Sequence, residues 1–189
     1  MTSAPRRQLK PRQVETVQKL LDGGLRQLEE GGAEALTIRQ VALQAGVSPA
    51  TAYTYFSSKG HLVTELFVRM LAEDAHEPSG RTPTARVQSV TRHLTDLLEG
   101  APALAAAVTV ALLGSDPDVD RLRLHVGAEF VSRFEEALGD AATPAVLEAL
   151  TFAFSGALLQ AGMGLVTYAE LGDRLDVVVA TILEGTLTP

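Results

Sequence analysis

Apolar residues recur at intervals of three and four positions along most of the chain, which is the period of an amphipathic helix. In residues 11–30 this stripe consists of Val14, Val17, Leu21, Leu25 and Leu28. Gly31 and Gly32 follow directly, and glycine commonly ends a helix. No segment alternates apolar and polar residues convincingly enough to predict a strand. The pattern therefore predicts an all-α protein.

Glycine and proline divide the rest of the chain into further helical segments. Three shorter helices are expected. One begins at Thr37, the second covers residues 49–55 and the third covers about 58–74. Five more follow, at about 83–99, 102–113, 117–139, 144–168 and 172–187. The total is about nine helices. Residues 77–83 are rich in turn formers, and we divide the chain into two domains, 1–60 and 61–189.

One short block carries the strongest local signals. Thr37 is a good N-cap, and Gln40 three residues later completes the pattern of a capping box. Gly46 allows the left-handed backbone of a tight turn. Ser48 and Pro49 then suit the N-cap and first position of a new helix. Two helices joined by a three-residue turn with glycine form a helix-turn-helix, whose second helix enters the major groove of DNA.

The same block, TIRQVALQAGVSPATAYTYFSSKGHL at residues 37–62, resembles the DNA-binding signature of the TetR (tetracycline-repressor-like) family. The matching positions are Thr37, Val41, Ala42, residues 45–48, Tyr53, Tyr55, Phe56, Lys59 and Leu62. The resemblance covers about the first 70 residues by motif, and the rest only by length and helical layout. It implies a transcriptional regulator with an N-terminal three-helix DNA-binding domain and a C-terminal helical domain for ligand binding and dimerisation.

The resemblance also assigns roles within this block. It implies base contacts for Arg39, Pro49, Ala50, Thr51 and Thr54, and phosphate contacts for Tyr53, Tyr55 and Lys59, with help from Thr37 and Ser48. These residue types suit the roles, because arginine can pair with guanine and a threonine methyl can touch thymine. Hydroxyls, lysine and helix N-termini bind phosphate oxygens.

The block departs from the usual family pattern in two places. The recognition helix starts with Pro49 and Ala50, which are poor in polar groups, so Arg39 is expected to carry more of the base reading. Gly60 and His61 stand where an acidic pair is common, so the next helix is expected to begin loosely. Phe56 is interpreted as core of the three-helix domain.

Charge is distributed unevenly along the chain. The net charge is −7, but residues 1–60 hold eight Lys/Arg and five Asp/Glu, whereas residues 61–189 hold eight and eighteen. A cationic end on an acidic body can bind a polyanion such as double-stranded DNA. Arg6, Arg7, Lys10 and Arg12 form a basic arm that either follows DNA phosphates or is a solvated tail.

The family resemblance further implies a homodimer formed through about residues 144–187. Helix-turn-helix proteins commonly bind palindromes as dimers. Small residues that would let a second helix approach are Ala149, Ala153, Gly156, Gln160, Gly164 and Thr167, and the last helix carries Leu175, Val178, Val179, Ile182 and Leu187. Packing of both stripes within one chain is the alternative.

A pocket for a small, largely apolar effector is also implied, and its occupation is expected to release a repressor from a palindromic operator. The candidate lining is Leu94, Leu97, Leu104, Val108, Val126, Phe130, Phe134, Phe154 and Leu158, with His93, His125 or Gln160 to orient the ligand. Core packing explains these apolar positions equally well. A regulator without a ligand is the alternative.

Other classes of protein have weaker support. His93 with Asp96 and His125 with Glu129 could bind a metal in a helical enzyme, but the sequence holds no nucleophile elbow, phosphate loop or HExxH motif. We therefore expect neither an enzyme nor a cofactor. The uncharged segment 149–169 is long enough to span a membrane, but its polar residues and glycines favour a helix buried in protein. Residues 1–12 lack the apolar run of a secretory signal, so we expect a cytoplasmic protein.

Overall fold

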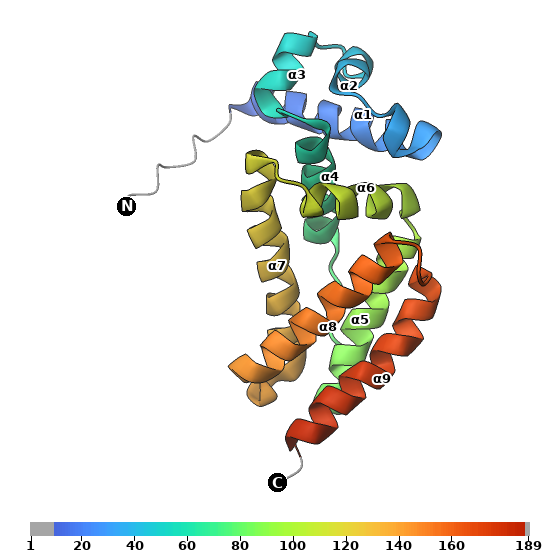
Figure 1. Cartoon of the computed structure of the whole chain (residues 1–189). Helices are drawn as coiled ribbons and strands as arrows, with labels where there is room; N and C mark the ends of the chain where they lie inside the picture. Colours follow the sequence, from blue (N-terminus) through green and yellow to red (C-terminus); the bar gives the residue numbers. More distant parts are fainter. Residues whose placement is uncertain (1–9, 188–189) are drawn as a thin grey trace.

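Nine α-helices make up almost all of residues 10–187, the part of the chain that this computed structural model describes, and no strand occurs there (Figure 1). They are α1 (Pro11–Ala35), α2 (Ile38–Gln44), α3 (Pro49–Tyr55), α4 (Lys59–Glu73), α5 (Pro83–Glu99), α6 (Pro102–Leu113), α7 (Pro117–Leu138), α8 (Pro144–Gly162) and α9 (Tyr168–Leu187). A short 3₁₀ turn, Gly139–Ala141, separates α7 from α8. The prediction of an all-α protein with about nine helices is confirmed.

Glycine interrupts α1 close to the predicted position. Gly32 leaves helical geometry, with φ 68° and ψ −176°, and one further short turn continues to Ala35. Because a residue with a Cβ resists positive φ, glycine at this position allows the chain to bend toward α2.

The boundary between the last two helices differs from the prediction. α8 ends at Gly162, because Gly164 adopts a left-handed backbone with φ 74°. Thr167 then caps α9: its Oγ1 accepts from the N–H of Glu170, whose carboxylate accepts from the N–H of Thr167. This reciprocal cap starts α9 at Tyr168. Gly172, which the sequence suggested as a break, lies inside α9 near α5, where an added Cβ would lie 3.3 Å from Thr95 Oγ1.

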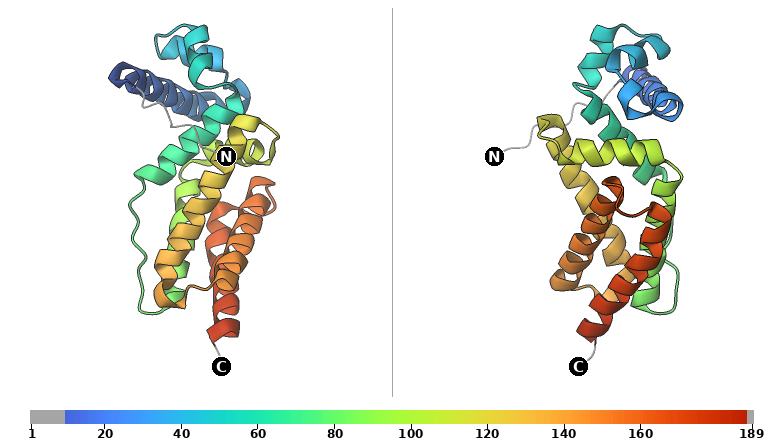
Figure 2. Two further views of the ribbon diagram at one scale, coloured as in Figure 1. Left: turned by 90° about the vertical axis from the view of Figure 1, so that its left-hand side faces the viewer. Right: turned by 45° about the vertical axis from the view of Figure 1, so that its right-hand side comes forward.

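The helices form two parts that α4 connects. α1, α2 and α3 lie at one end of the molecule, which we call the head, and α5 to α9 form the body (Figure 1). α4 packs on α1 in the head and on α6 and α7 in the body. α6 lies crosswise beneath the head, at 104° to α5. Residues 74–82 run down one side of the body before α5 begins (Figure 2).

The hydrophobic core is continuous from the head into the body. In the head it includes Leu20, Val41, Ala52, Phe56 and Leu62. In the body, the ring of Phe154 meets those of Phe130 and Phe134 edge to face, with centroids 5.1 and 5.6 Å apart. This is a favourable aromatic geometry. Since α4 packs in both parts, the domain division at residue 60 stays a prediction.

Helix α8 is apolar on two sides, and only one of them is covered. Only 22% of its apolar 18-residue window is buried within the chain. Phe152 is 70% exposed and Met163 56% exposed, while Phe154 lies in the core. Length and composition alone would allow α8 to cross a membrane. A single chain thus buries only one side of this segment, and its expected burial in protein stays a prediction for the face that points outward.

Candidate DNA interface and effector cavity

Side-chain hydroxyls begin each helix of the helix-turn-helix region. Thr37 Oγ1 accepts from the N–H of Gln40 at 3.2 Å, and Ser48 Oγ accepts from the N–H of Thr51 at 3.1 Å. Of the expected capping box at Thr37, only this half forms, because the Gln40 side chain accepts from the Thr37 hydroxyl. Gly46 has φ 69°, as its position in the turn predicts. These local bonds fix the angle between α2 and α3.

Helix α3 turns one face to the core and the other to solvent. Ala52 is fully buried and Phe56 is nearly so. The residues assigned to DNA contacts share the outer surface of the head: Thr37, Arg39, Ser48, Pro49, Ala50, Tyr53, Thr54 and Lys59 are exposed, and Thr51 and Tyr55 are half-buried. Arg39 is the only charged residue of α2 and α3. This surface therefore offers hydroxyls and the cations Arg39 and Lys59, and α2 and α3 carry no acid that would repel a phosphate.

Lys59 and the basic arm frame this surface. The Lys59 ammonium donates to the carbonyl of Ala33 at 2.9 Å and, with three donors, can still reach a second oxygen. Lys10 and Arg12 are exposed at the start of α1. Arg6 and Arg7 lie outside the described residues. The arm thus stays a prediction.

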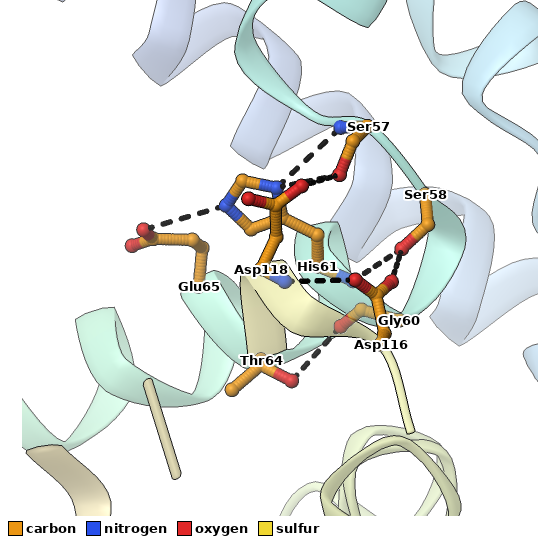
Figure 3. Close-up of polar contacts among 8 residues, drawn as sticks. All are labelled: Ser57, Ser58, Gly60, His61, Thr64, Glu65, Asp116 and Asp118. Carbon is orange, nitrogen blue, oxygen red and sulfur yellow. Dashed lines mark hydrogen bonds and ion pairs between the residues drawn. The ribbon is translucent and has the colours of Figure 1, made fainter. Parts of the chain in front are cut away.

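The start of α4 is held by α7. Ser58 Oγ caps α4 by accepting from the N–H of His61 and donates to Asp116 Oδ2 (Figure 3). Ser57 Oγ donates to Asp118 Oδ2 at 2.5 Å. Hydrogen bonds from Ser58 and from the N–H of Asp118 lower the pKa of Asp116 below its ordinary value.

We call these four residues, Ser57, Ser58, Asp116 and Asp118, the serine–aspartate contact. The expectation that α4 begins loosely is wrong, because α7 supplies the acids that Gly60 and His61 do not.

A cavity of about 280 Å³ lies in the body, between α4 and the helices from α5 to α9. Its lining is Phe67, Leu98, Ala105, Val108, Thr109, Leu112, Leu113, Arg123, Val126, Gly127, Phe130, Ser155, Leu158, Leu159 and Tyr168. Four of these, Val108, Val126, Phe130 and Leu158, belong to the candidate lining from the sequence. The cavity is mostly apolar and suits an apolar ligand.

The other candidates for the lining lie elsewhere. Leu94, Phe134 and Phe154 are buried in the core. Leu97 and Leu104 border a separate hollow beside α1. Gln160 and His125 are exposed, and His93 binds Asp74 instead. The helical spacing of apolar residues cannot distinguish core residues from residues that line the cavity, because both kinds face inward.

Sequence reasoning missed four polar residues of the cavity, Thr109, Arg123, Ser155 and Tyr168. Arg123 Nε donates to the carbonyl of Leu112 at 2.6 Å, and its Nη2 donates to the carbonyl of Gly114 at 2.7 Å. Tyr168 is hydrogen-bonded to Thr109, but burial raises the pKa of its phenol overall. Only Gly127, an unexplained glycine in the middle of a helix, could have indicated open space beside α7.

A second polar cluster joins the end of α4 to α5 and α7. Asp74 accepts from Arg133 and bonds to His93 Nε2 at 2.6 Å. The imidazole of His76 stacks on that of His93, with centroids 4.0 Å apart. Neither suggested metal pair forms a site: among the described residues, no three His, Asp or Glu side chains are placed to hold a metal ion.

Comparison with known proteins decides the family. Residues 20–66, from α1 into α4, match the family described as bacterial regulatory proteins, tetR family. The chain is 43% identical over 181 residues to an HTH-type transcriptional regulator of Mycobacterium tuberculosis. These aligned residues cover 94% of this chain and 85% of that protein. The chain belongs to the TetR family.

Two further similarities agree with this TetR assignment. The HTH-type transcriptional repressor KstR of Rhodococcus jostii is 31% identical over 131 residues, covering 68% of this chain and 62% of that protein. The crystal structure of a TetR transcriptional regulator from Rhodococcus sp. RHA1 has a TM-score of 0.78 at 21% identity, covering 93% and 98% of the two chains. As a TetR-family member, the chain is a DNA-binding transcriptional regulator, and these relatives are regulators and not enzymes.

Proposed function

We propose that this TetR-family protein is a homodimeric repressor that leaves a palindromic operator when a small, largely apolar effector occupies the cavity. The turn between α6 and α7 carries this proposal. Leu112, Leu113 and Arg123 around the turn line the cavity, while Asp116 and Asp118 bond to the head. The repressor KstR, to which the chain is similar, supports the sign of regulation.

Operator reading is assigned to the outer surface of α2 and α3. Arg39 is the group best suited to a bidentate bond with guanine in the major groove. Pro49, Ala50, Thr51 and Thr54 present small and methyl-bearing surfaces to base edges. Tyr53, Tyr55 and Lys59, with Thr37 and Ser48, supply donors to phosphates and fix the register of the head on DNA.

A second copy of the chain is assigned to the uncovered face of α8 and the adjoining part of α9. On α8 the small residues Ala149, Ala153 and Gly156 are partly exposed beside Phe152, and a Cβ added at Gly156 would meet nothing within 4 Å. Gly164 and Thr167 lie beyond the end of α8.

On α9, Leu175 and Val179 are buried within the chain, whereas Val177 and Val178 are exposed. Ile182 packs against the chain's own core, and the side chain of Leu187 lies outside the described residues. The proposed interface thus uses part of each stripe that the sequence suggested. A partner on this face would cover the exposed apolar side of α8, so no membrane is needed to cover it. This agrees with a protein that acts in the cytoplasm beside DNA.

The coupling from cavity to head runs through the serine–aspartate contact. A ligand that presses on Leu112 or Leu113 displaces the turn, which Arg123 ties to the start of α7. Asp116 and Asp118 then move relative to Ser57 and Ser58, and the head turns on the body. An effector that favours the turned head lowers operator affinity by its differential binding to the two states.

Selection of DNA sites from a random library tests the repressor proposal. At about 150 mM salt, which must be fixed because phosphate contacts are salt-dependent, we expect a palindrome with half-sites about one helical turn or more apart. A protein that is folded by circular dichroism and enriches no sequence would contradict operator binding.

Light scattering tests the dimer with two matched variants. Phe152→Glu places a charge on the proposed interface and is expected to give a monomer with weakened operator binding. Leu124→Glu on α7, where the leucine is 76% exposed, is the control and is expected to remain a dimer. A wild-type monomer at micromolar concentration, or equal behaviour of the two variants, would contradict the interface.

A further inference from the structure

A second hollow, which we call the head–body hollow, lies where the head meets the body. Its volume is about 400 Å³, and its walls come from α1 of the head, from the C-terminal half of α4, and from the corner between α5 and α6. The floor is apolar: Leu66 and Leu104 are buried, and Leu25, Met70 and Leu97 are half-buried. A molecule in this hollow would contact head and body at once, so its binding would favour the head position in which it fits.

The positive charge at this hollow is already paired. Among the described residues, Arg69 is the one cation in the lining, and its Nη1 donates to Asp22 Oδ1 at 2.7 Å. The lining carboxylate of Asp74 is also paired, because it accepts from Arg133 and bonds to His93. These pairs leave no excess positive charge that would attract an anion.

Two glutamates in the lining have no close cation of their own. Glu29 is exposed and makes no hydrogen bond or ion pair with any described residue. Glu73 has a side chain that is 72% exposed, and its Oε1 lies 3.9 Å from Arg69 Nε. That distance is too long for a hydrogen bond. The hollow therefore combines an apolar floor with two carboxylates that remain open to a ligand.

The helix ends at this hollow do not reverse that charge. α4 and α5 end beside it, and neither has a basic residue in its last turn. α6 begins there, with no side-chain acceptor at its N-cap Ala101. Each helix C-terminus carries about −0.5 charge and a helix N-terminus about +0.5, so these three ends sum to about −0.5. The positive end of α6 thus does not offset Glu29 and Glu73.

We propose that the head–body hollow binds a cationic amphiphile, whose charged group faces Glu29 and Glu73 and whose apolar chain packs on Leu66, Met70 and Leu104. An anion of the same length would meet two carboxylates and no free cation. This site goes beyond the proposed function. Its binding test uses neither operator nor effector, so the site and the repressor can fail separately.

Methionine methyl NMR tests the site with three probes of matched length: octylammonium, 1-octanol and octanoate. Of the two described methionines, Met70 lines the hollow and Met163 does not. Titration of the full-length protein at about pH 7, where an alkylamine is protonated, should shift the Met70 methyl resonance, assigned with Met70→Leu. Octylammonium is expected to bind most tightly at Met70 and octanoate most weakly. An unmoved Met70 resonance, equal shifts of Met70 and Met163, or octanoate binding as tightly as octylammonium would overturn the assignment.

Removal of one carboxylate tests the charged part of the site. Glu29→Gln keeps the shape of the hollow and should weaken octylammonium about three-fold, while 1-octanol is unchanged. Glu148→Gln, at an exposed glutamate of α8 that lines neither the cavity nor the hollow, removes the same charge elsewhere and is the matched control. Equal affinity of the two variants for octylammonium would overturn the assignment.

A last variant distinguishes the hollow from the effector cavity. Gly127 lines that cavity, and a Cβ added there would meet no heavy atom within 4 Å, so Gly127→Leu narrows the cavity without a clash at Cβ. Octylammonium is expected to bind Gly127→Leu as tightly as it binds the wild type. A loss of binding in Gly127→Leu would place the probe in the effector cavity and overturn the assignment.

Discussion

The two ends of α4 are held to α7 by different chemistry. At its C-terminal end, Asp74 receives a charged hydrogen bond from Arg133, and the two side chains are only 9% and 12% exposed. At its N-terminal end, the uncharged hydroxyls of Ser57 and Ser58 donate to the carboxylates of Asp118 and Asp116, nearer to solvent and with no cation in these two bonds. Water can replace the second set of bonds far more readily than the first. We infer that the end near Asp74 is the fixed end of α4 and that the end near the head is the one that moves.

The largest effect is expected at the fixed end. Arg133→Met leaves Asp74 buried without its cation, so the free energy of unfolding should fall by about 3 kcal/mol. Arg92→Met is the control: this arginine is 48% exposed and pairs with Asp173 and Asp176 at the surface, so its loss should be below about 1 kcal/mol. Urea denaturation measures both. Similar losses would remove the distinction between the two ends.

A substitution in the head that touches neither end of α4 distinguishes operator recognition from the effect of the ligand on operator affinity. Arg39→Ala removes the proposed guanine contact and should weaken operator binding by about 2 kcal/mol, roughly thirty-fold. Unfolding should be nearly unchanged because Arg39 is exposed. Fluorescence anisotropy with labelled operator, with and without a saturating apolar ligand of the cavity, should give the same affinity ratio as the wild type. A changed ratio would implicate Arg39 in coupling.

At the movable end, a small loss of stability should accompany a large loss of coupling. Ser57→Ala removes the bond to Asp118 but no helix cap, so unfolding should change by about 1 kcal/mol or less. The ratio of operator affinities without and with a saturating apolar ligand of the cavity should fall several-fold. Ser132→Ala, at an exposed serine of α7 away from this contact, is the control. An unchanged ratio in Ser57→Ala would show that the serine–aspartate contact carries no coupling.

The smallest effect is a pH dependence at the fixed end. Burial, and then the neighbouring charge of His93, lower the pKa of His76 below its ordinary value of 6.5. The unfolded chain therefore binds more protons than the folded one as the pH falls below 6.5, so stability declines in that direction. His76→Phe should reduce the decline between about pH 7 and pH 5, measured by urea denaturation. The exposed His125→Phe should leave it unchanged, and equal curves for His76→Phe and wild type would contradict this origin.

Features set by neighbouring residues were predictable from the sequence. Thr37, Ser48 and Gly46 act within three or four positions of themselves, so capping and turn chemistry located α2 and α3 closely. Phe56 was expected in the core and is 3% exposed. The end of α8 was missed because Gly164 and the cap at Thr167 override an apolar pattern that continues past Gly162.

Features that depend on distant segments were not predictable. Asp118 lies 61 positions from Ser57, and nothing local indicates that it stabilises the start of α4. Likewise, hydrophobic periodicity shows that Val126 and Phe134 face inward but not which of them borders open space. Arg123 reads as a surface residue until the end of α6 supplies its acceptors.

The uncovered apolar face of α8 has a consequence for the amount of protein in the cell. On the proposed dimer, unfolding releases two chains from one folded unit, so the melting temperature rises with total concentration. A dilute chain would expose Phe152 and its neighbours to any other apolar surface. The threshold at which repression begins would then depend on how fast newly made chains meet, which makes gene dosage as important as operator sequence.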